Sequence, residues 1–132
     1  MSHFTKLNLE IKNIEALKVA ATAMGMVVAE NEKARGWSGN KMKADYVIKG
    51  PGRYDIAVVN NGKAYDLVAD WSMADAALVK KVGAKGQLLI QNYGVACAAE
   101  IAKENNMDVE YETLEDGTIR LILTEDEYLN QY

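Results

Sequence analysis

Hydrophobic residues fall at every second position near the start of the chain and predict a strand over residues 4–11. The alternating apolar residues are Leu7, Leu9 and Ile11. Short apolar runs over 26–29 and 46–48 predict two further strands, and Pro51 with Gly52 interrupts the chain after the second of these runs. The polar, glycine-bearing stretch between the two runs, from residue 31 to 43, predicts a loop.

Helical periodicity follows the first strand and returns in the second half of the chain. The first helix is expected over 14–24, with Asn13 as its N-cap and Gly25 as its left-handed stop. A capping-box pattern at 72–75 predicts a second helix over 73–82. A third helix, over about 87–105, places four residues on one side: Ile90, Tyr93, Cys97 and Ile101.

Two hairpins are predicted from their turn residues. In the first, over 54–70, Asn61 and Gly62 form a two-residue turn that sets Val58 opposite Tyr65 and leaves one side apolar. The other side then carries three carboxylates: Asp55, Asp66 and Asp70. The second hairpin lies within 109–123 and allows two registers. A two-residue turn would mix its faces, so we favour a three-residue loop with a G1 bulge, which pairs Tyr111 with Leu121.

These elements predict a single α+β domain over residues 1–132. Its sheet is expected to be mostly antiparallel, with six or seven strands and helices packed on one face. The tail from residue 124 onward is either one capped helical turn or a frayed acidic end.

Composition narrows the classes of function. Net charge is −4 and the pI is near 5.0, so general nucleic-acid binding is not expected, because phosphate contacts need a basic face. The sequence has no apolar run of about 18 residues, so no membrane span is expected. The start of the chain lacks a signal-peptide pattern and Cys97 is the single cysteine, so we expect a reducing, cytosol-like compartment.

The three aspartates allow two interpretations. Diagonal neighbours on a sheet face lie about 7–8 Å apart, so Asp55 would lie near both Asp66 and Asp70, within reach of a shared Mg²⁺ or Mn²⁺. The alternative is a solvated or ion-paired face, because Arg53 would lie opposite Asp70 and neutralise it without a metal.

The 31–43 stretch gathers cations around glycines and a tryptophan. Its candidate ligand-binding residues are Arg35, Gly36, Trp37, Lys41 and Lys43, with His3, the single histidine, as a further candidate. Backbone N–H groups, cations and a stacking ring suit an anionic ligand, although the glycines match no Walker A or dinucleotide fingerprint. The alternative is a mobile solvated loop with Trp37 folded onto the core.

Several stretches resemble one known family along nearly the whole chain. They are "MSHFTKL", "IEALKVAATAMGM", "ARGWSG", "ADYVIKG", "YDIAVVNNGKAYDLVADW", "IQNYG" and "EDGTIRLIL". The chain resembles the plastid hypothetical reading frame thirty-five family, also called domain of unknown function twelve fifty-seven. The resemblance implies a small cytosolic or plastid-stromal protein of a kind found in cyanobacteria, algal plastids, other bacteria and some viruses. It implies no established activity, and "NYGVACAAEIA" is more alanine-rich than the usual family pattern.

Two functions are therefore expected, in this order. The first is a non-enzymatic accessory or binding module that contacts a protein partner or a small anionic ligand, with homo-oligomerisation left open. The second is a divalent-metal-dependent hydrolase or phosphoryl-transfer enzyme built on the aspartates. No cofactor is required by any motif in the sequence.

Overall fold

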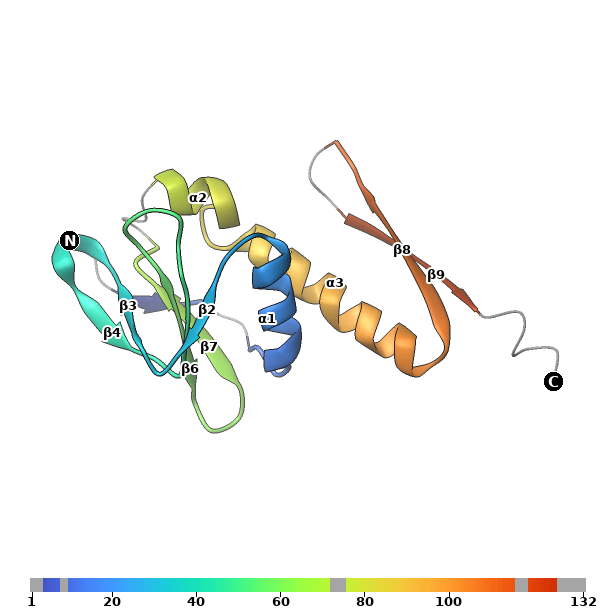
Figure 1. The fold of residues 1–132 in the computed structure, drawn as a ribbon, viewed down its shortest axis with the longest axis horizontal. Helices are drawn as coiled ribbons and strands as arrows, with labels where there is room; N and C mark the ends of the chain where they lie inside the picture. The colour runs from blue at the N-terminus through green and yellow to red at the C-terminus, as the bar shows by residue number, and fades with distance from the viewer. Residues whose placement is uncertain (1–3, 8–9, 72–75, 116–118, 126–132) are drawn as a thin grey trace.

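The computed structural model describes residues 4–7, 10–71, 76–115 and 119–125 (Figure 1). The helical elements are α1 (Ile14–Ala23), the short 3-10 turn η1 (Trp37–Gly39), α2 (Ala76–Val82) and α3 (Gln87–Glu104). The strands are β1 (Thr5–Lys6), β2 (Val28–Glu30), β3 (Lys33–Arg35), β4 (Lys41–Lys43), β5 (Tyr46–Ile48), β6 (Ile56–Asn60), β7 (Tyr65–Ala69), β8 (Met107–Thr113) and β9 (Ile119–Glu125).

The fold is α+β, with every paired strand antiparallel, and this part of the expectation is confirmed. The expected size of the sheet is wrong. The strands form one five-stranded sheet, in the order β1-β7-β6-β5-β2, and two separate two-stranded sheets, β3-β4 and β8-β9.

Strand β1 is shorter than the alternating pattern predicts. Thr5 and Lys6 pair with the end of β7, and Leu7 N donates to Leu67 O at 2.9 Å. Pairing with β7 returns at Ile11, whose N–H donates to Tyr65 O at 3.1 Å. More residues separate Leu7 from Ile11 than separate their partners on β7, so the strand cannot continue in one register.

The end signals of α1 are confirmed. Asn13 has an extended backbone and its side chain accepts a hydrogen bond from Ala16 N at 3.0 Å, as expected of an N-cap. Gly25 has a φ of +81°. Tyr93 of α3 fixes this end of α1 to the third helix, because its hydroxyl accepts hydrogen bonds from the backbone N–H groups of Lys12 and Asn13.

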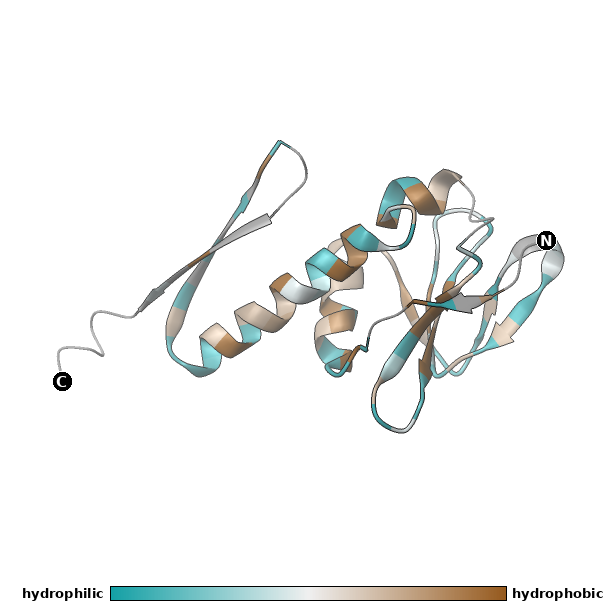
Figure 2. Ribbon diagram, turned by 180° about the vertical axis from the view of Figure 1, so that it is seen from behind, coloured by the Kyte–Doolittle hydropathy of each residue, from teal (hydrophilic) through white to brown (hydrophobic). Residues whose placement is uncertain are grey.

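The main core lies between the helices and one face of the five-stranded sheet. The helices contribute Leu17, Ala20 and Ala21 from α1, Leu78 and Val82 from α2, and Leu89 from α3. The sheet contributes Ile48, Ile56, Val58, Leu67 and Ala69 to the same cluster. Figure 2 shows the hydrophobic colouring of these central strands. The apolar side of the predicted 54–70 hairpin is therefore buried, as expected.

The stretch from 31 to 43 is not the predicted loop but a β-hairpin, β3-η1-β4. Lys33 pairs with Lys43, Ala34 with Met42 and Arg35 with Lys41. The inner side of this hairpin packs on the second face of the sheet, where Ala34, Met42 and Ala44 join Val47, Ala57 and Val68 in a second core cluster. The acidic side of the sheet, which we expected to be open to solvent, is covered for this reason.

The turn of the 54–70 hairpin is displaced by one residue from its predicted position. Asn61 N donates to Ala64 O, and the Asn61 side chain accepts from Lys63 N and Ala64 N, each at 2.9 Å. Gly62, with a φ of +94°, becomes the first central residue, a position that favours glycine. Val58 therefore lies opposite Leu67 instead of Tyr65, a shift of two residues that leaves every side chain on its predicted face.

The second half of the chain follows the sequence patterns closely. Helix α2 ends at Val82, directly before Gly83, whose φ is +92°, and α3 begins at the predicted Gln87. The predicted capping box at 72–75 lies outside the described residues. Strands β8 and β9 pair Tyr111 with Leu121, which confirms the favoured register. The bulge at 116–118 and the tail from residue 126 lie outside the described residues. Thr124 and Glu125, the first two residues of the predicted tail, belong to strand β9 and not to a helical turn.

Candidate functional site

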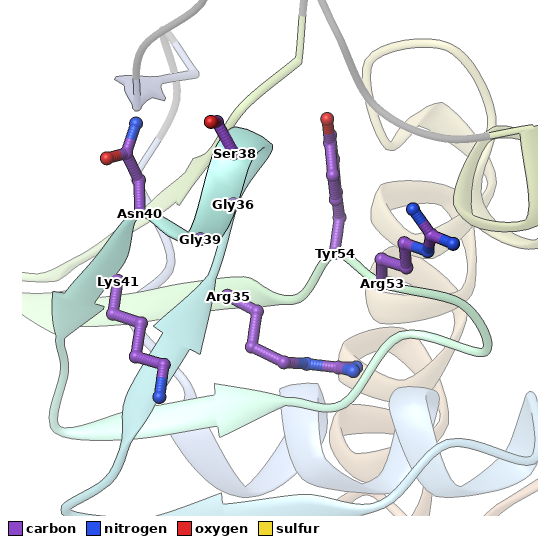
Figure 3. Close-up of a pocket in the computed structure, with 8 residues that line it drawn as sticks. All are labelled: Arg35, Gly36, Ser38, Gly39, Asn40, Lys41, Arg53 and Tyr54. Carbon is purple, nitrogen blue, oxygen red and sulfur yellow. The ribbon is translucent and has the colours of Figure 1, made fainter.

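An open cleft of about 670 Å³ lies at the tip of the β3-η1-β4 hairpin (Figure 3). Its lining residues come from the hairpin and from the segment that leads into β6: Arg35, Gly36, Ser38, Gly39, Asn40, Lys41, Arg53 and Tyr54. Three of these eight described residues are cationic and none is acidic. We call β3, η1 and β4 together the basic hairpin.

Two backbone features shape this cleft. Ser38 and Gly39 both have positive φ values, +56° and +79°, so the chain reverses tightly at the hairpin tip. Gly36 lies against the ring of Phe4, and a Cβ at this position would approach Phe4 Cζ to 2.6 Å. The close approach explains the glycine and anchors the hairpin to the start of the chain.

Arg35 is held in the cleft by a buried carboxylate. Its Nε and Nη2 donate to Asp55 at 2.9 Å and 2.8 Å, in the bidentate geometry that suits a guanidinium. Two backbone N–H groups, of Arg35 and Gly50, complete four hydrogen bonds to Asp55. The Asp55 side chain is 0% exposed and that of Arg35 is 42% exposed, so the ion pair joins the interior to the cleft.

These contacts keep Asp55 ionised. Burial alone would raise the pKa of the Asp55 carboxyl, because a charge is poorly solvated there. The hydrogen bonds from the Arg35 side chain, from the two backbone N–H groups and the charge of Arg35 together outweigh burial and lower this pKa below its ordinary value. The Asp55 carboxylate accepts all four of these hydrogen bonds, so its oxygens are already in use and its role is to position Arg35.

The outer side of the basic hairpin carries two cross-strand pairs of like charge. Lys33 lies directly opposite Lys43, and Arg35 lies directly opposite Lys41. The three lysines are exposed. Like charges at opposed positions destabilise a sheet, so this arrangement has a cost in stability that an anion on this surface would relieve.

The structure brings together some of the predicted site residues and separates others. Arg35, Gly36 and Lys41 line the cleft, while Lys43 lies next to it on the outer side of β4. Trp37 belongs to η1, but its side chain lies outside the description, as does the whole of His3.

The three aspartates do not form the shared site that was considered from the sequence. Asp55 is bound to Arg35, Asp66 accepts from the Asn61 side chain at 3.0 Å, and Asp70 is buried at 1% exposure. Within the described ranges, no three His, Cys, Asp or Glu residues are arranged to hold a metal ion. The covering hairpin accounts for the environment of Asp55, because Arg35 of β3 binds this carboxylate.

Several residues were not recognised from the sequence as part of this site: Ser38, Asn40, Arg53 and Tyr54. A signal for the hairpin was present, because "KAR" and "KMKA" alternate charged and apolar residues on either side of "GWSGN". In two extended strands, this alternation places the cations on one side of the hairpin, so the pattern was a signal for β3 and β4. Nothing in the sequence brings Arg53 and Tyr54 to the same cleft, since this proximity depends on how β3 lies beside the start of β6.

Comparison with known proteins identifies the family. A family described as "Protein of unknown function (DUF1257)" matches residues 20–122. The chain belongs to the DUF1257 family. It is 29% identical over 125 residues to "Uncharacterized protein ycf35" of Pyropia yezoensis, covering 93% of this chain and 96% of the relative. It is also 29% identical over 129 residues to the protein of the same name from Cyanophora paradoxa, with the same coverage.

Membership of the DUF1257 family confirms the resemblance drawn from the sequence. No solved structure matches the chain. Among the described residues, no helix is both long and apolar enough to cross a membrane. The family description and the names of these relatives state no activity, so the chemistry of the site carries the functional argument.

Proposed function

We propose that this DUF1257 protein is a non-enzymatic binding module that holds anionic groups, carboxylate or phosphate, on the basic hairpin and in its cleft. The observation that carries this proposal is the placement of Arg35 opposite Lys41 and Lys33 opposite Lys43 beside a cleft without described acidic lining. Clustered cations favour anion binding even when the whole chain carries a net negative charge.

The Arg35–Asp55 pair supports the same proposal. Anchoring by Asp55 limits the rotamers of Arg35, so an anion in the cleft meets a guanidinium that is already positioned. Lys41 and Arg53 line the same cleft and add positive charge to it. We infer a site that recognises charge and rough shape rather than one that performs a reaction.

No observation in the described residues favours the metal-dependent hydrolase. Asp55 accepts four hydrogen bonds, which leaves little capacity for a metal ion. As part of the proposal, the protein acts in the cytoplasm or the plastid stroma, and its ligand is either a small anion or an acidic surface of a protein.

Calorimetric titration with tripolyphosphate at low salt tests the proposal. The parent protein should bind the probe with an affinity that falls as salt is added, because exposed charges are screened. Lys41→Ala combined with Lys43→Ala should weaken binding roughly tenfold, as expected for the loss of two cationic contacts. Lys103→Ala, an exposed lysine at the end of α3, is the matched control and should leave binding unchanged.

The result that overturns the proposal is equally direct. Tripolyphosphate that fails to bind the parent protein, or that binds the double variant and the parent with equal affinity, would show that the basic hairpin is not an anion site. Circular dichroism of the double variant checks that its fold is retained.

A further inference from the structure

Strand β8 presents a row of carboxylates on one side of the β8-β9 hairpin. Asp108, Glu110 and Glu112 alternate along the strand and all three are exposed. Across the hairpin they lie opposite Thr124, Ile122 and Arg120. We call β8 and β9 together the acidic arm.

The acidic arm and the basic hairpin match in spacing and are opposite in charge. Alternate residues of a strand repeat about every 6.7 Å, so the carboxylates of β8 and the cations of β3 and β4 follow the same period. Two successive acidic positions, Asp108 and Glu110, can therefore face the two rows formed by Lys33 with Lys43 and by Arg35 with Lys41. A small anion would use only part of this surface.

The two surfaces lie at opposite ends of the molecule. Figure 1 places β3 and β4 at one end of the long axis and β8 and β9 at the other, with the five-stranded sheet, α1 and α3 between them. In this structure the acidic arm therefore does not reach the basic hairpin of its own chain. A second copy can supply the complementary end.

Two further features of the acidic arm indicate that contact with another chain would stabilise it. A two-stranded sheet is at best marginally stable alone in water. Ile122, opposite Glu110 on the acidic side, is 41% exposed, and Ile101 near the end of α3 is 60% exposed. Contact with another chain would bury apolar surface next to the carboxylates.

We propose that the acidic arm of one copy binds the basic hairpin of a second copy, head to tail. This inference rests on the proposed function and names its ligand as a row of strand carboxylates. The contact is heterologous, because two different surfaces meet, so repetition produces either a closed ring or an open chain of copies.

Sedimentation velocity of the full chain, with two complementary variants, tests the proposal. One variant, Lys41→Ala with Lys43→Ala, removes charge from the basic hairpin. The other, Asp108→Asn with Glu110→Gln, removes charge from the acidic arm. The parent should form species larger than a monomer at low salt and dissociate at about 1 M salt, where screening acts within about 3 Å.

Mixing the variants gives the decisive result. Each should be monomeric alone, with self-association weakened roughly tenfold or more. An equimolar mixture should form a complex of two copies and nothing larger, because one intact acidic arm meets one intact basic hairpin. This rescue also shows that both variants are folded. Glu104→Gln, an acidic residue of α3 outside the row, should associate as the parent does.

Two results would overturn the inference: a parent that stays monomeric at low salt, or variants that remain monomers when mixed while the parent associates. Tripolyphosphate titration separates this failure from failure of the proposed function. A monomeric parent that still binds tripolyphosphate through Lys41 and Lys43 keeps its anion site and loses only its partner.

Discussion

Arg35 and Asp55 lie 20 residues apart in the chain and form a bidentate ion pair, with Arg35 Nη2 at 2.8 Å from Asp55 Oδ1. The carboxylate is fully buried, whereas the Arg35 side chain is partly exposed and Arg35 lines the cleft. One residue was expected to bind an anion and the other a metal ion. Their pairing makes Asp55 the support of a cation and ties the basic hairpin to the start of β6.

Replacing Asp55 with asparagine should destabilise the protein. All four partners of the Asp55 carboxylate are donors, so an amide NH₂ at this place would face other N–H groups. We expect a loss of about 3 kcal/mol in the free energy of unfolding, the low end for a broken buried pair, because Arg35 is partly solvated. Urea denaturation measures it. Asp66→Asn is the control and should cost far less, since Asp66 is only half-buried.

The free energy of unfolding should decrease at low pH because Asp55 becomes protonated. Its pKa is lowered in the folded state from an ordinary value of 3.8, so the unfolded chain takes up the proton first as pH falls. The stabilisation is complete above pH 3.8 and is lost as pH falls through the lower folded pKa. Urea titrations from pH 6 to pH 2 measure this loss. Asp55→Asn should flatten the acid side of the curve, and an unchanged curve would contradict the assignment.

A methyl group at Gly50 should be far more damaging than one at Gly94. The Cβ of Gly50→Ala would lie 1.8 Å from the Tyr54 backbone oxygen, so the segment that carries the cleft must move. We expect a loss of about 3 kcal/mol or more. Gly94 lies within α3 with open space at its Cβ, and Gly94→Ala should stabilise the protein by about 1 kcal/mol. Thermal unfolding of both variants tests the contrast, which equal effects would refute.

Lys43→Glu should make the protein more stable and less able to bind anions. The substitution turns the opposed pair with Lys33 into one of opposite charge. We expect the unfolding midpoint to rise by roughly 1–2 °C at low salt, while tripolyphosphate binding weakens. Differential scanning calorimetry and titration calorimetry measure the two effects. A variant that is both stabilised and fully competent for binding would show that the like charges serve no ligand.

Asn13 should contribute to stability by two separable contacts. Its side-chain oxygen caps α1 and its Nδ2 donates to Glu100 of α3 at 2.7 Å. Asn13→Ala should cost about 1 kcal/mol, mainly through the lost cap. Asn13→Asp keeps the cap but places a second carboxylate beside Glu100. The stability that this variant loses should therefore become smaller when salt is added, because salt screens the repulsion. Urea denaturation at two salt concentrations distinguishes the variants.

Local signals in the sequence were sufficient at the two ends of α1 and in the hairpin of β8 and β9. Asn13 and Gly25 mark the ends of α1 because a cap bond and a positive φ involve only adjacent backbone. The pairing of Tyr111 with Leu121 followed from keeping apolar residues on one side. The predicted register of the 54–70 hairpin was wrong because the Asn61 side chain, and not its backbone oxygen, accepts the hydrogen bond from Ala64 N that closes the turn.

The candidate site was harder to predict because it depends on contacts distant in sequence. Arg35, Gly36 and Lys41 were identified by charge and glycine content, and they do line the cleft. The burial of Asp55 beneath these residues was not predicted, because it depends on the packing of β3 beside the start of β6. A short strand rich in lysine has the composition of a loop. The buried residue of β3 is Ala34, whose small side chain gives only a weak hydrophobic signal in the sequence.

Helix α3 has a geometric consequence for the end of the molecule that it supports. Its 18 residues extend for about 27 Å, and each added residue would advance the terminal hairpin by about 1.5 Å and rotate it by about 100°. The length of this one helix therefore determines both how far the hairpin projects and the direction in which it points, so natural variants with insertions here would aim the same strands at a different neighbour.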